Sequence, residues 1–353
     1  MFREFTSTHF VTHRFRVFFL GLTAVTSAVI ALIPLGTAAQ KAETVKIVKK
    51  GVEVEVTIGG RLFTRYTMLC APNKPVFYPI LTDTGKSFTR RWPVEPDAAP
   101  GESHDHVHHR GLWFTHSSVN GIDFWSEEGK NIGKTVTTRI SDVHSGNKTG
   151  SFTANTEWRS PDGKLMATDR REIKVTPLPT GDTLLDFNIT IKPAAGSLLF
   201  GDNKDGVFGL RLPDSLAVNP TVKPKVTGTG HILTSTGAKD ADAWGKRADW
   251  VDYWGPIEGE TYGVAIFDSP QNFRHPQTWH ARDYGLFTVN PFGLHDFNLG
   301  PKGAGDLTVP GGDALHAEYC VYFHRGDAEQ ADVAGQYKKF STNALAGLEK
   351  RTQ

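Results

Sequence analysis

Apolar and polar residues alternate along most of the chain after residue 45. Residues 52–58 alternate strictly, and Gly59 and Gly60 separate them from a second alternating run, 62–66. A period of two residues bounded by turn-forming residues is typical of β-strands with one buried face. The same pattern recurs at 46–50, 135–143, 150–158, 170–175, 183–191, 226–234, 262–268, 286–289 and 314–324. The pattern predicts a chain that is mostly β-structure.

One segment near the C-terminus has the composition of a helix. Residues 327–344 follow Gly326 and are rich in alanine, glutamine and lysine, which favour helices. Regularly spaced strands with few helices predict an all-β fold, a large two-sheet β-sandwich with a C-terminal helix. Neither a repeat nor a linker divides residues 40–353, so they are predicted to form one domain.

Residues 1–39 have the layout of a secretory signal peptide. Three arginines precede an apolar run, 17–35, and small residues at 37–39 offer a cleavage site before Gln40. The alternative is an uncleaved membrane anchor, because the run nearly reaches the ~20 residues that cross a bilayer. No second run of that length follows. The mature protein is therefore expected in the periplasm or outside the cell, with no membrane span after cleavage.

The charge balance argues against nucleic acid as a partner. The chain has a net charge of +1, and its leader contains three arginines and one glutamate, so the mature protein is close to −1. Binding a phosphate backbone requires concentrated lysine and arginine, which this chain lacks. A small molecule or a glycan is the expected partner.

The chain has two cysteines, Cys70 and Cys320. In an oxidising compartment two cysteines can pair. Both also lie in apolar runs, where a cysteine can be a plain core residue. The sequence leaves both alternatives open.

The densest candidate chemistry lies within residues 101–128. Imidazole transfers protons near neutral pH and also binds borderline metals such as zinc. His116 follows a cluster in which four of the fourteen histidines lie within six residues: His104, His106, His108 and His109.

The histidine cluster has two interpretations. If residues 104–108 are extended, His104, His106 and His108 share one face, where they could bind a divalent metal with a carboxylate orienting them. Alternatively, the cluster forms the floor of a proton-transfer pocket. In that case His109 and His116 would act as acid and base, and Arg110 would stabilise negative charge on an oxygen. The spacing establishes no cofactor.

Other segments add polar and aromatic side chains to the candidate site. Asp205 is a possible acid or base, and lysine and arginine can bind sugar hydroxyls. Tryptophan beside a carboxylate suits stacking on a pyranose ring, and His280 and Arg282 share a face if their segment is extended. The predicted substrate-binding residues are Trp113, Trp125, Lys204, Arg211, Trp250, Asp252 and Arg282.

We predict that the segments around His109, His116, Asp205, Asp252 and His280 converge on one cavity. Each places polar or aromatic groups on an otherwise ordinary strand framework, and a binding pocket gathers a few such groups. His280 is a further candidate for acid/base chemistry in this cavity.

Five motifs together resemble the PmoA-like family of exported bacterial proteins, and the resemblance covers most of the mature chain. The family is named after a methane oxygenase subunit, but a membrane subunit would need several spanning helices. The motifs are H-D-H-x-H-H-R-G-L-W-F, G-x-D-F-W, D-G-x-F-G-L-R, W-x-D-Y-W-G and G-L-F-x-x-N-P-F-G.

The resemblance implies a sandwich similar to that of the sugar mutarotases, in which histidines and a carboxylate act on a sugar ring. His108, His109, His116 and His280 are the positions that would play such roles here. The expected function is an exported carbohydrate-active enzyme: a lyase, hydrolase or epimerase acting on a sugar or an oxidised sugar derivative. The alternatives are a non-catalytic glycan-binding protein and a metal-dependent enzyme that uses the histidine cluster.

Overall fold

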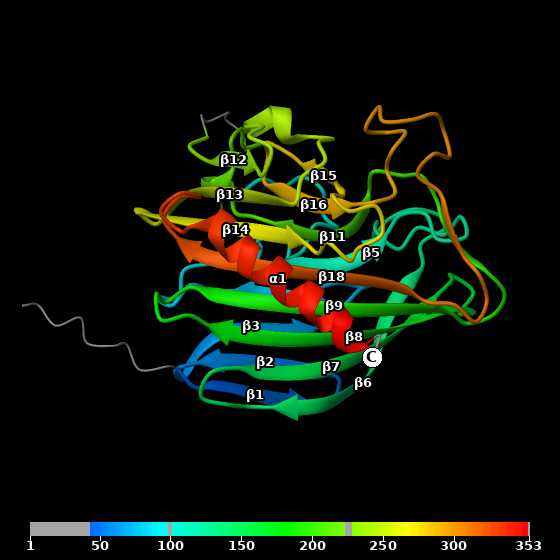
Figure 1. Cartoon of the computed structure of the whole chain (residues 1–353), viewed down its shortest axis with the longest axis horizontal. Helices are drawn as coiled ribbons and strands as arrows, with labels where there is room; N and C mark the ends of the chain where they lie inside the picture. The colour runs from blue at the N-terminus through cyan, green and yellow to red at the C-terminus, as the bar shows by residue number, and fades with distance from the viewer. Residues whose placement is uncertain (1–42, 98–100, 223–227, 352–353) are drawn as a thin grey trace, which may run out of the picture. The chain divides into compact units, whose positions relative to one another are not determined.

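The computed structural model describes residues 43–97, 101–222 and 228–351. The predicted leader, its cleavage site and the domain boundary at residue 39 lie outside these residues. In the described part, the alternating segments form strands, which assemble into two sheets of eight strands each (Figure 1). Within the same ranges, no helix combines the length and apolar character that crossing a bilayer requires.

The first sheet, sheet A, collects strands from both ends of the chain, and its neighbouring strands are antiparallel. Because β11 lies between β5 and β16, segments far apart in sequence lie side by side. In spatial order the strands are β1 (Val45–Lys50), β2 (Glu53–Ile58), β3 (Arg61–Thr67), β4 (Val76–Ile80), β5 (Leu112–His116), β11 (Gly206–Arg211), β16 (Leu286–Asn290) and β15 (Thr278–Ala281).

The second sheet, sheet B, is also antiparallel. Its order is β12 (His231–Thr234), β13 (Trp250–Ile257), β14 (Glu260–Asp268), β18 (Leu315–Arg325), β9 (Thr183–Pro193), β8 (Leu165–Pro177), β7 (Gly150–Arg159) and β6 (Lys134–His144). The remaining elements are a ribbon of β10 (Leu198–Phe200) and β17 (Leu307–Val309), two 3₁₀ turns, η1 (Asp214–Leu216) and η2 (Asp240–Ala243), and the helix α1 (Val333–Arg351).

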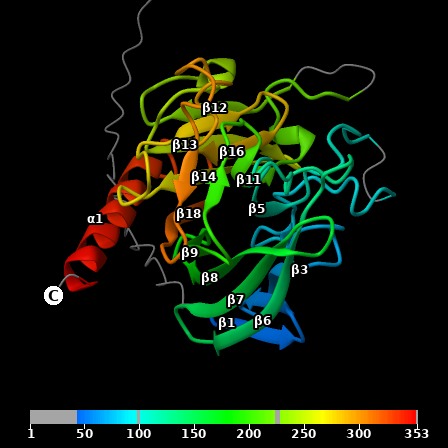
Figure 2. The same ribbon diagram turned by 90° about the vertical axis from the view of Figure 1, so that its right-hand side faces the viewer.

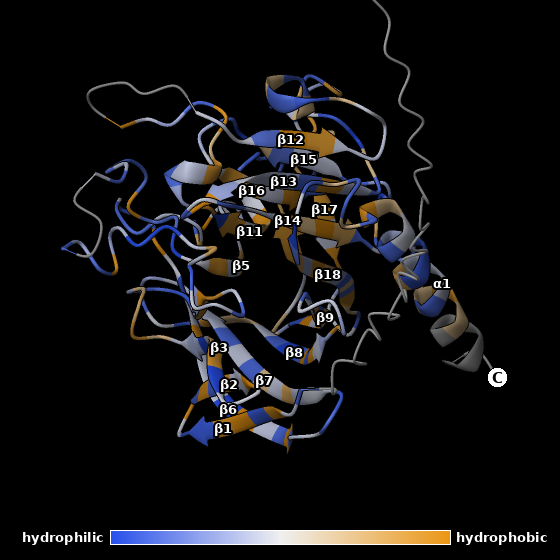
Figure 3. Cartoon of the chain, turned by 90° about the vertical axis from the view of Figure 1, so that its left-hand side faces the viewer, coloured by the Kyte–Doolittle hydropathy of each residue, from blue (hydrophilic) through white to orange (hydrophobic). Residues whose placement is uncertain are grey.

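Alternate residues of the two sheets pack against each other and form the core. Phe77 of sheet A contacts Phe187 of sheet B edge to face at 5.4 Å between ring centroids. Phe208 of sheet A stacks on Tyr319 of sheet B at 4.9 Å. Figure 3 shows the underlying alternation of hydrophobic and hydrophilic residues along strands such as β1. The prediction of a two-sheet sandwich with a C-terminal helix is confirmed.

Four neighbouring strands of sheet A, from β5 to the edge strand β15, do not alternate in burial, because they are buried on both faces. Every residue of β5, β11, β16 and β15 is buried. Loops cover the side that faces away from sheet B. This explains why the sequence pattern did not predict β4 or β15. The covered outer face is where the candidate functional residues gather.

Helix α1 packs on the outer face of sheet B (Figures 1 and 2). Its Tyr337 lies edge to face against Phe267 of β14, 5.7 Å away. The helix begins at Val333 and not at the predicted Asp327. The carboxylate of Asp327 accepts hydrogen bonds from the backbone N–H groups of residues 329 and 330, which form a turn. Asp332 then has a positive φ of 49°, which a helix does not allow.

The two cysteines are free thiols in different places. Cys70 packs beside Trp113 on the outer face of sheet A. Cys320 is buried on sheet B, in the cluster that α1 covers. Both cysteines are therefore unpaired residues of apolar clusters, which was one of the two alternatives that the sequence left open. Burial raises the pKa of both thiols.

Candidate functional site

One row of residues crosses the centre of sheet A on its outer face. Trp113 lies opposite Gly209, Gly209 opposite Thr288, and Thr288 opposite His280. Residues directly opposite each other in antiparallel strands point to the same face. Trp279, next to His280, packs in the core between the sheets, so the row points away from that core. We call this row and the loops that cover it the histidine face.

The segment carrying the histidine cluster lies over this row, but it is not extended. His106 has a positive φ of 44°, and residues 107 and 108 form a turn. His104 stacks on Trp92, whereas His106 lies between His109, at 4.8 Å, and Tyr284, at 5.0 Å between ring centroids. Three imidazoles on one face are therefore not observed.

This conformation bears directly on the predicted metal site. His104 lies against a tryptophan ring, while His106 and His108 contact His109. Among the described residues, no group of three or more histidine, cysteine, aspartate or glutamate side chains is arranged to hold a metal ion. The predicted metal-binding set of His104, His106 and His108 is not formed, because His104 stacks on Trp92 while His106 and His108 lie against each other and His109.

A buried arginine holds the segment 103–109, which we call the histidine loop, in place. The guanidinium of Arg90 has no solvent exposure and donates hydrogen bonds to the carbonyl oxygens of Ser103, Asp105, His106 and His109. It also pairs with the carboxylate of Asp105. One planar donor group thus fixes four carbonyls within seven residues of an irregular segment. Nothing in the local sequence around Arg90 indicated this role.

The carboxylate of Asp105 also accepts hydrogen bonds from a second arginine and from a threonine. The Nη2 atom of Arg211 and the Oγ1 atom of Thr221 each lie 2.7 Å from its carboxylate oxygens. Burial raises the pKa of Asp105, but hydrogen bonds from His106 and Thr221 and the charges of both arginines lower it well below its usual value. Arg211 is fully buried. It pairs with Asp105 and positions the loop, a role that the sequence did not predict for this residue.

His109 lies beneath the loop and is almost fully buried. Burial lowers its pKa well below the usual histidine value, and the nearby positive groups lower it further, so the ring is neutral. Its Nδ1 atom lies 3.5 Å from Nη1 of Arg211. Because a guanidinium can only donate, Nδ1 is the acceptor and the ring proton is on Nε2.

The predicted tryptophan platform for sugar stacking is not observed. Trp113 and Trp125 are 2% and 1% exposed and pack against each other at 4.9 Å between ring centroids. Trp250 belongs to sheet B and is buried in the cluster that α1 covers. These rings fill two apolar clusters, so none of the three presents a free face to a ligand.

His280 occupies the other end of the outer row, on β15. Its Nδ1 atom lies 3.1 Å from the carbonyl oxygen of Lys204, which also accepts a hydrogen bond from Asn290. A carbonyl only accepts, so Nδ1 carries the proton and Nε2 keeps its lone pair. Burial lowers the pKa of His280 to about 3, and the charges of Lys204 and Arg282 act in the same direction.

Partly exposed charged groups surround His280. Lys204 Nζ lies 3.3 Å from the Asp205 carboxylate, and these side chains are 39% and 34% exposed. The guanidinium of Arg282 lies over the ring of Tyr284, 5.4 Å from its centroid. Tyr284 also stacks on His106, which links the histidine loop to this group. The structure thus brings His106, His109, Lys204, Asp205, His280 and Arg282 to the histidine face.

Three predicted residues have other partners. His116 is fully buried, its Nε2 donates to the carbonyl of Gly201 at 2.7 Å, and burial lowers its pKa to about 4. Asp252 lies on sheet B and pairs with buried His324 at 3.0 Å. Arg110 forms a two-pronged ion pair with Glu127.

These positions correct the predicted convergence. The predicted roles for His116, Asp252 and Arg110 are not supported by their positions. His116 and Asp252 are fully buried, and the charge of Arg110 is balanced by Glu127.

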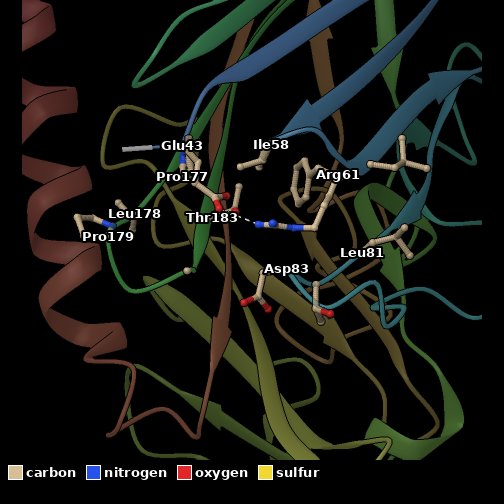
Figure 4. A pocket seen from close by; sticks show the side chains of 13 residues that line it. Glu43, Ile58, Arg61, Leu81, Asp83, Pro177, Leu178, Pro179 and Thr183 are labelled. Carbon is tan, nitrogen blue, oxygen red and sulfur yellow. Dashed lines mark hydrogen bonds and ion pairs between the residues drawn. The ribbon is translucent and has the colours of Figure 1, made fainter. Parts of the chain in front are cut away.

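Two hollows lie away from the histidine face. A groove of about 1050 Å³ runs between sheet B and α1, where polar side chains such as Lys174 and Asp186 pair with each other. A small pocket of about 100 Å³ opens at one end of the sandwich, where Arg61 pairs with Glu43 at 2.7 Å (Figure 4). Neither contains a residue predicted from the sequence to act in the site.

The fold and the site together define an all-β sandwich protein with buried neutral histidines and partly exposed charges on the outer face of one sheet. The chain belongs to a family of unknown function, DUF6807, whose sequence profile matches residues 53–338.

No curated protein matches the chain in sequence. Among solved structures it is similar to a GalM/aldose epimerase homologue from C. elegans, with 10% identity and a TM-score of 0.31 over 81% of this chain and 100% of that one. It is also similar to the Slr1438 protein from Synechocystis sp. PCC 6803, with 10% identity and a TM-score of 0.32 over 81% of this chain and 93% of that one.

Proposed function

We propose that this protein is an exported enzyme that acts on a carbohydrate or an oxidised sugar derivative by proton transfer. The arrangement of His280 carries the proposal. Its Nδ1–H is fixed by the Lys204 carbonyl, while Nε2 keeps its lone pair in a ring that the charges of Lys204 and Arg282 reach. An imidazole with one nitrogen held and the other free is suited to accept a proton from a bound substrate.

Lyase, hydrolase and epimerase reactions on sugars each need one group that takes a proton and another that returns one. His280 would accept the proton, and Asp205, which follows the Lys204 that holds Nδ1 of His280, is a partly exposed carboxylate that can exchange a second one. Lys204 would stabilise negative charge that develops on a substrate oxygen. His109 lies one layer deeper and supports the ring of His106, so it is a positioning residue in this scheme.

The alternative of a non-catalytic glycan-binding protein relied on exposed tryptophan rings. Trp113, Trp125 and Trp250 are buried, so that surface does not exist in the predicted form. The alternative of a metal-dependent enzyme relied on three imidazoles on one face, whereas His104 stacks on Trp92, away from His106 and His108. Proton transfer by side chains is therefore the function we favour.

Two parts of the proposal rest on sequence. Export rests on the basic, apolar and small-residue layout of residues 1–39. The resemblance to the PmoA-like family rests on motifs, and those motifs supply much of the histidine face, including His106, His109 and Arg211. Recovery of a mature protein that begins near Gln40 would support export, and an intact N-terminus in the membrane fraction would contradict it.

The decisive experiment is turnover by a His280→Asn variant. The asparagine amide can still donate to the Lys204 carbonyl, as Nδ1 does, but it has no equivalent of Nε2. Wild type and variant would be screened against glycosides, 3-keto-glycosides and uronic acid derivatives. We expect the variant to retain its fold and to lose roughly 10²–10⁴-fold of the rate.

A matched control is His316→Asn, which changes an exposed histidine on β18 of sheet B. That variant should turn over substrate as the wild type does. Full activity in the folded His280→Asn protein would contradict the proposed role of His280.

A further inference from the structure

We propose that the substrate of the histidine face carries a carboxylate group, as a uronic acid does, and that Arg282 binds this carboxylate. The inference rests on the proposed function, since it names the class of sugar that the same site would accept. It is carried by the charges that face the site and by the guanidinium of Arg282.

The carboxylates nearest the buried histidines are already neutralised. Asp105 is shared by Arg90 and Arg211. Glu127 pairs with Arg110 and with buried Lys74. Each of these two carboxylates is thus held by two basic side chains.

Two cationic side chains, Lys204 and Arg282, act on His280. Asp205 is the carboxylate that could balance their charge locally, and Lys204 already holds that group at 3.3 Å. Arg282 follows β15 two residues after His280 and is partly exposed. The positive charges of Lys204 and Arg282 disfavour the ionised form of His280. A ligand that brings negative charge to this point would therefore be attracted.

Arg282 is the group best placed to bind such a ligand. Its guanidinium rests on the ring of Tyr284, and in the described ranges it forms no ion pair with a carboxylate. Stacking on an aromatic ring leaves the N–H edges of a guanidinium available, and those edges match the two oxygens of a carboxylate. Tyr284 is itself held between Arg282, Arg211 and the ring of His106, so the guanidinium is supported on a fixed surface.

Binding of a carboxylate would also change His280. Burial keeps the pKa of this imidazole low, and the two neighbouring cations add to the effect. A negative charge placed beside Arg282 favours the protonated ring and raises its pKa. Binding of a charged substrate would thus make His280 a stronger base, whereas binding of a neutral sugar would leave the pKa of His280 unchanged.

The test measures binding by titration calorimetry at low and high salt. The probes are glucuronate and galacturonate, with glucose and galactose as neutral counterparts, and acetate and inorganic phosphate as simple anions. We expect a uronate to bind at least 10-fold more tightly than its neutral counterpart. We also expect Arg282→Gln to weaken uronate binding roughly 10–100-fold, the effect of losing a charge-assisted hydrogen-bonded pair. Arg139→Gln, an exposed change on β6, is the matched control and should bind as the wild type does.

Several results would overturn the inference: equal binding of uronates and neutral sugars, no binding of either uronate, unchanged binding by Arg282→Gln, or acetate and phosphate binding as tightly as the uronates. The proposed function fails separately. If the protein turns over neutral glycosides and His280→Asn abolishes that turnover, the proposal of an enzyme stands, and the proposal that its substrate carries a carboxylate is wrong. If uronates bind through Arg282 but His280→Asn keeps full turnover, the ligand class stands and the catalytic role of His280 does not.

Discussion

His280 and His109 are both buried and both neutral, but they offer opposite chemistry to the histidine face. In His280 the Lys204 carbonyl takes the Nδ1 proton, so Nε2 is an acceptor. In His109 the Arg211 guanidinium faces Nδ1, so Nε2 is a donor. The tautomer of each ring is set by a partner that is distant in sequence and can play only one role.

These tautomers can be observed directly. ¹⁵N NMR of labelled protein should show the proton on Nδ1 of His280 and on Nε2 of His109. Because burial lowers the pKa of His280 to about 3, its ¹⁵N shifts should not change between pH 5 and pH 8. A His280 ring that titrates near pH 6.5 would show that the imidazole is open to water and not held as described.

At the residue scale, the sequence showed which side chains could act but not how they are arranged. The cluster at 104–109 and the His280–Arg282 pair do meet, through Tyr284. His116 belongs to the same dense run, yet it faces Phe292 in the core. Arg90 was missed altogether, because its importance comes from four carbonyls and no sequence pattern reports them.

At the scale of elements, strands with one exposed face were predicted well, whereas of the strands buried on both faces β16 was predicted and β4 and β15 were not. Residues 150–158 and 183–191 alternate and correspond closely to β7 and β9. β4, with the sequence VFYPI, has no alternation because apolar residues cover both of its faces. Periodicity reports a difference between two faces, so it gives no signal where both are buried. The candidate site lies on such strands.

The histidine loop is an element held by charge instead of by regular hydrogen bonding. Asp105→Asn would leave Arg90 and Arg211 buried without their shared carboxylate. We expect the free energy of unfolding to fall by about 3 kcal/mol, as when one partner of a buried ion pair is removed. Urea unfolding would measure the change.

Asp313→Asn, in an exposed turn, is the control for this experiment and should leave the unfolding free energy unchanged within ~0.5 kcal/mol. If the two variants are equally stable, the carboxylate of Asp105 does not hold the loop.

At the scale of the whole molecule, sheet B carries ionised pairs that make stability depend on pH. His324 and Asp252 are both fully buried and lie 3.0 Å apart. Burial alone lowers the pKa of His324, but the charge and hydrogen bond of Asp252 outweigh it and raise the pKa above the usual value. A histidine whose pKa is raised on folding stabilises the protein below the pKa of the unfolded chain, about 6.5, and this contribution is lost as the pH rises through the folded value.

The protein should therefore unfold at lower urea concentrations in mildly alkaline buffer than at pH 6. His324→Gln should be less stable at pH 6 by roughly 3 kcal/mol, because Asp252 stays buried without its cation. The variant should also lose part of the alkaline dependence. A parallel pH dependence in variant and wild type would assign the effect to another group, for example His275, which pairs with buried Asp268 and also has a raised pKa.

The order of strands in sheet A has a consequence for how activity appears during folding. β5 pairs with β11, and β11 pairs with β16, so the outer row is completed by residues that lie far apart along the chain. Contacts between distant segments close large loops and form slowly. The early hairpin of β2 and β3 needs none of these partners. A newly made chain would therefore hold much of its β-structure before Arg282 and His106 first meet across Tyr284, and catalytic competence would be among the last properties that it gains.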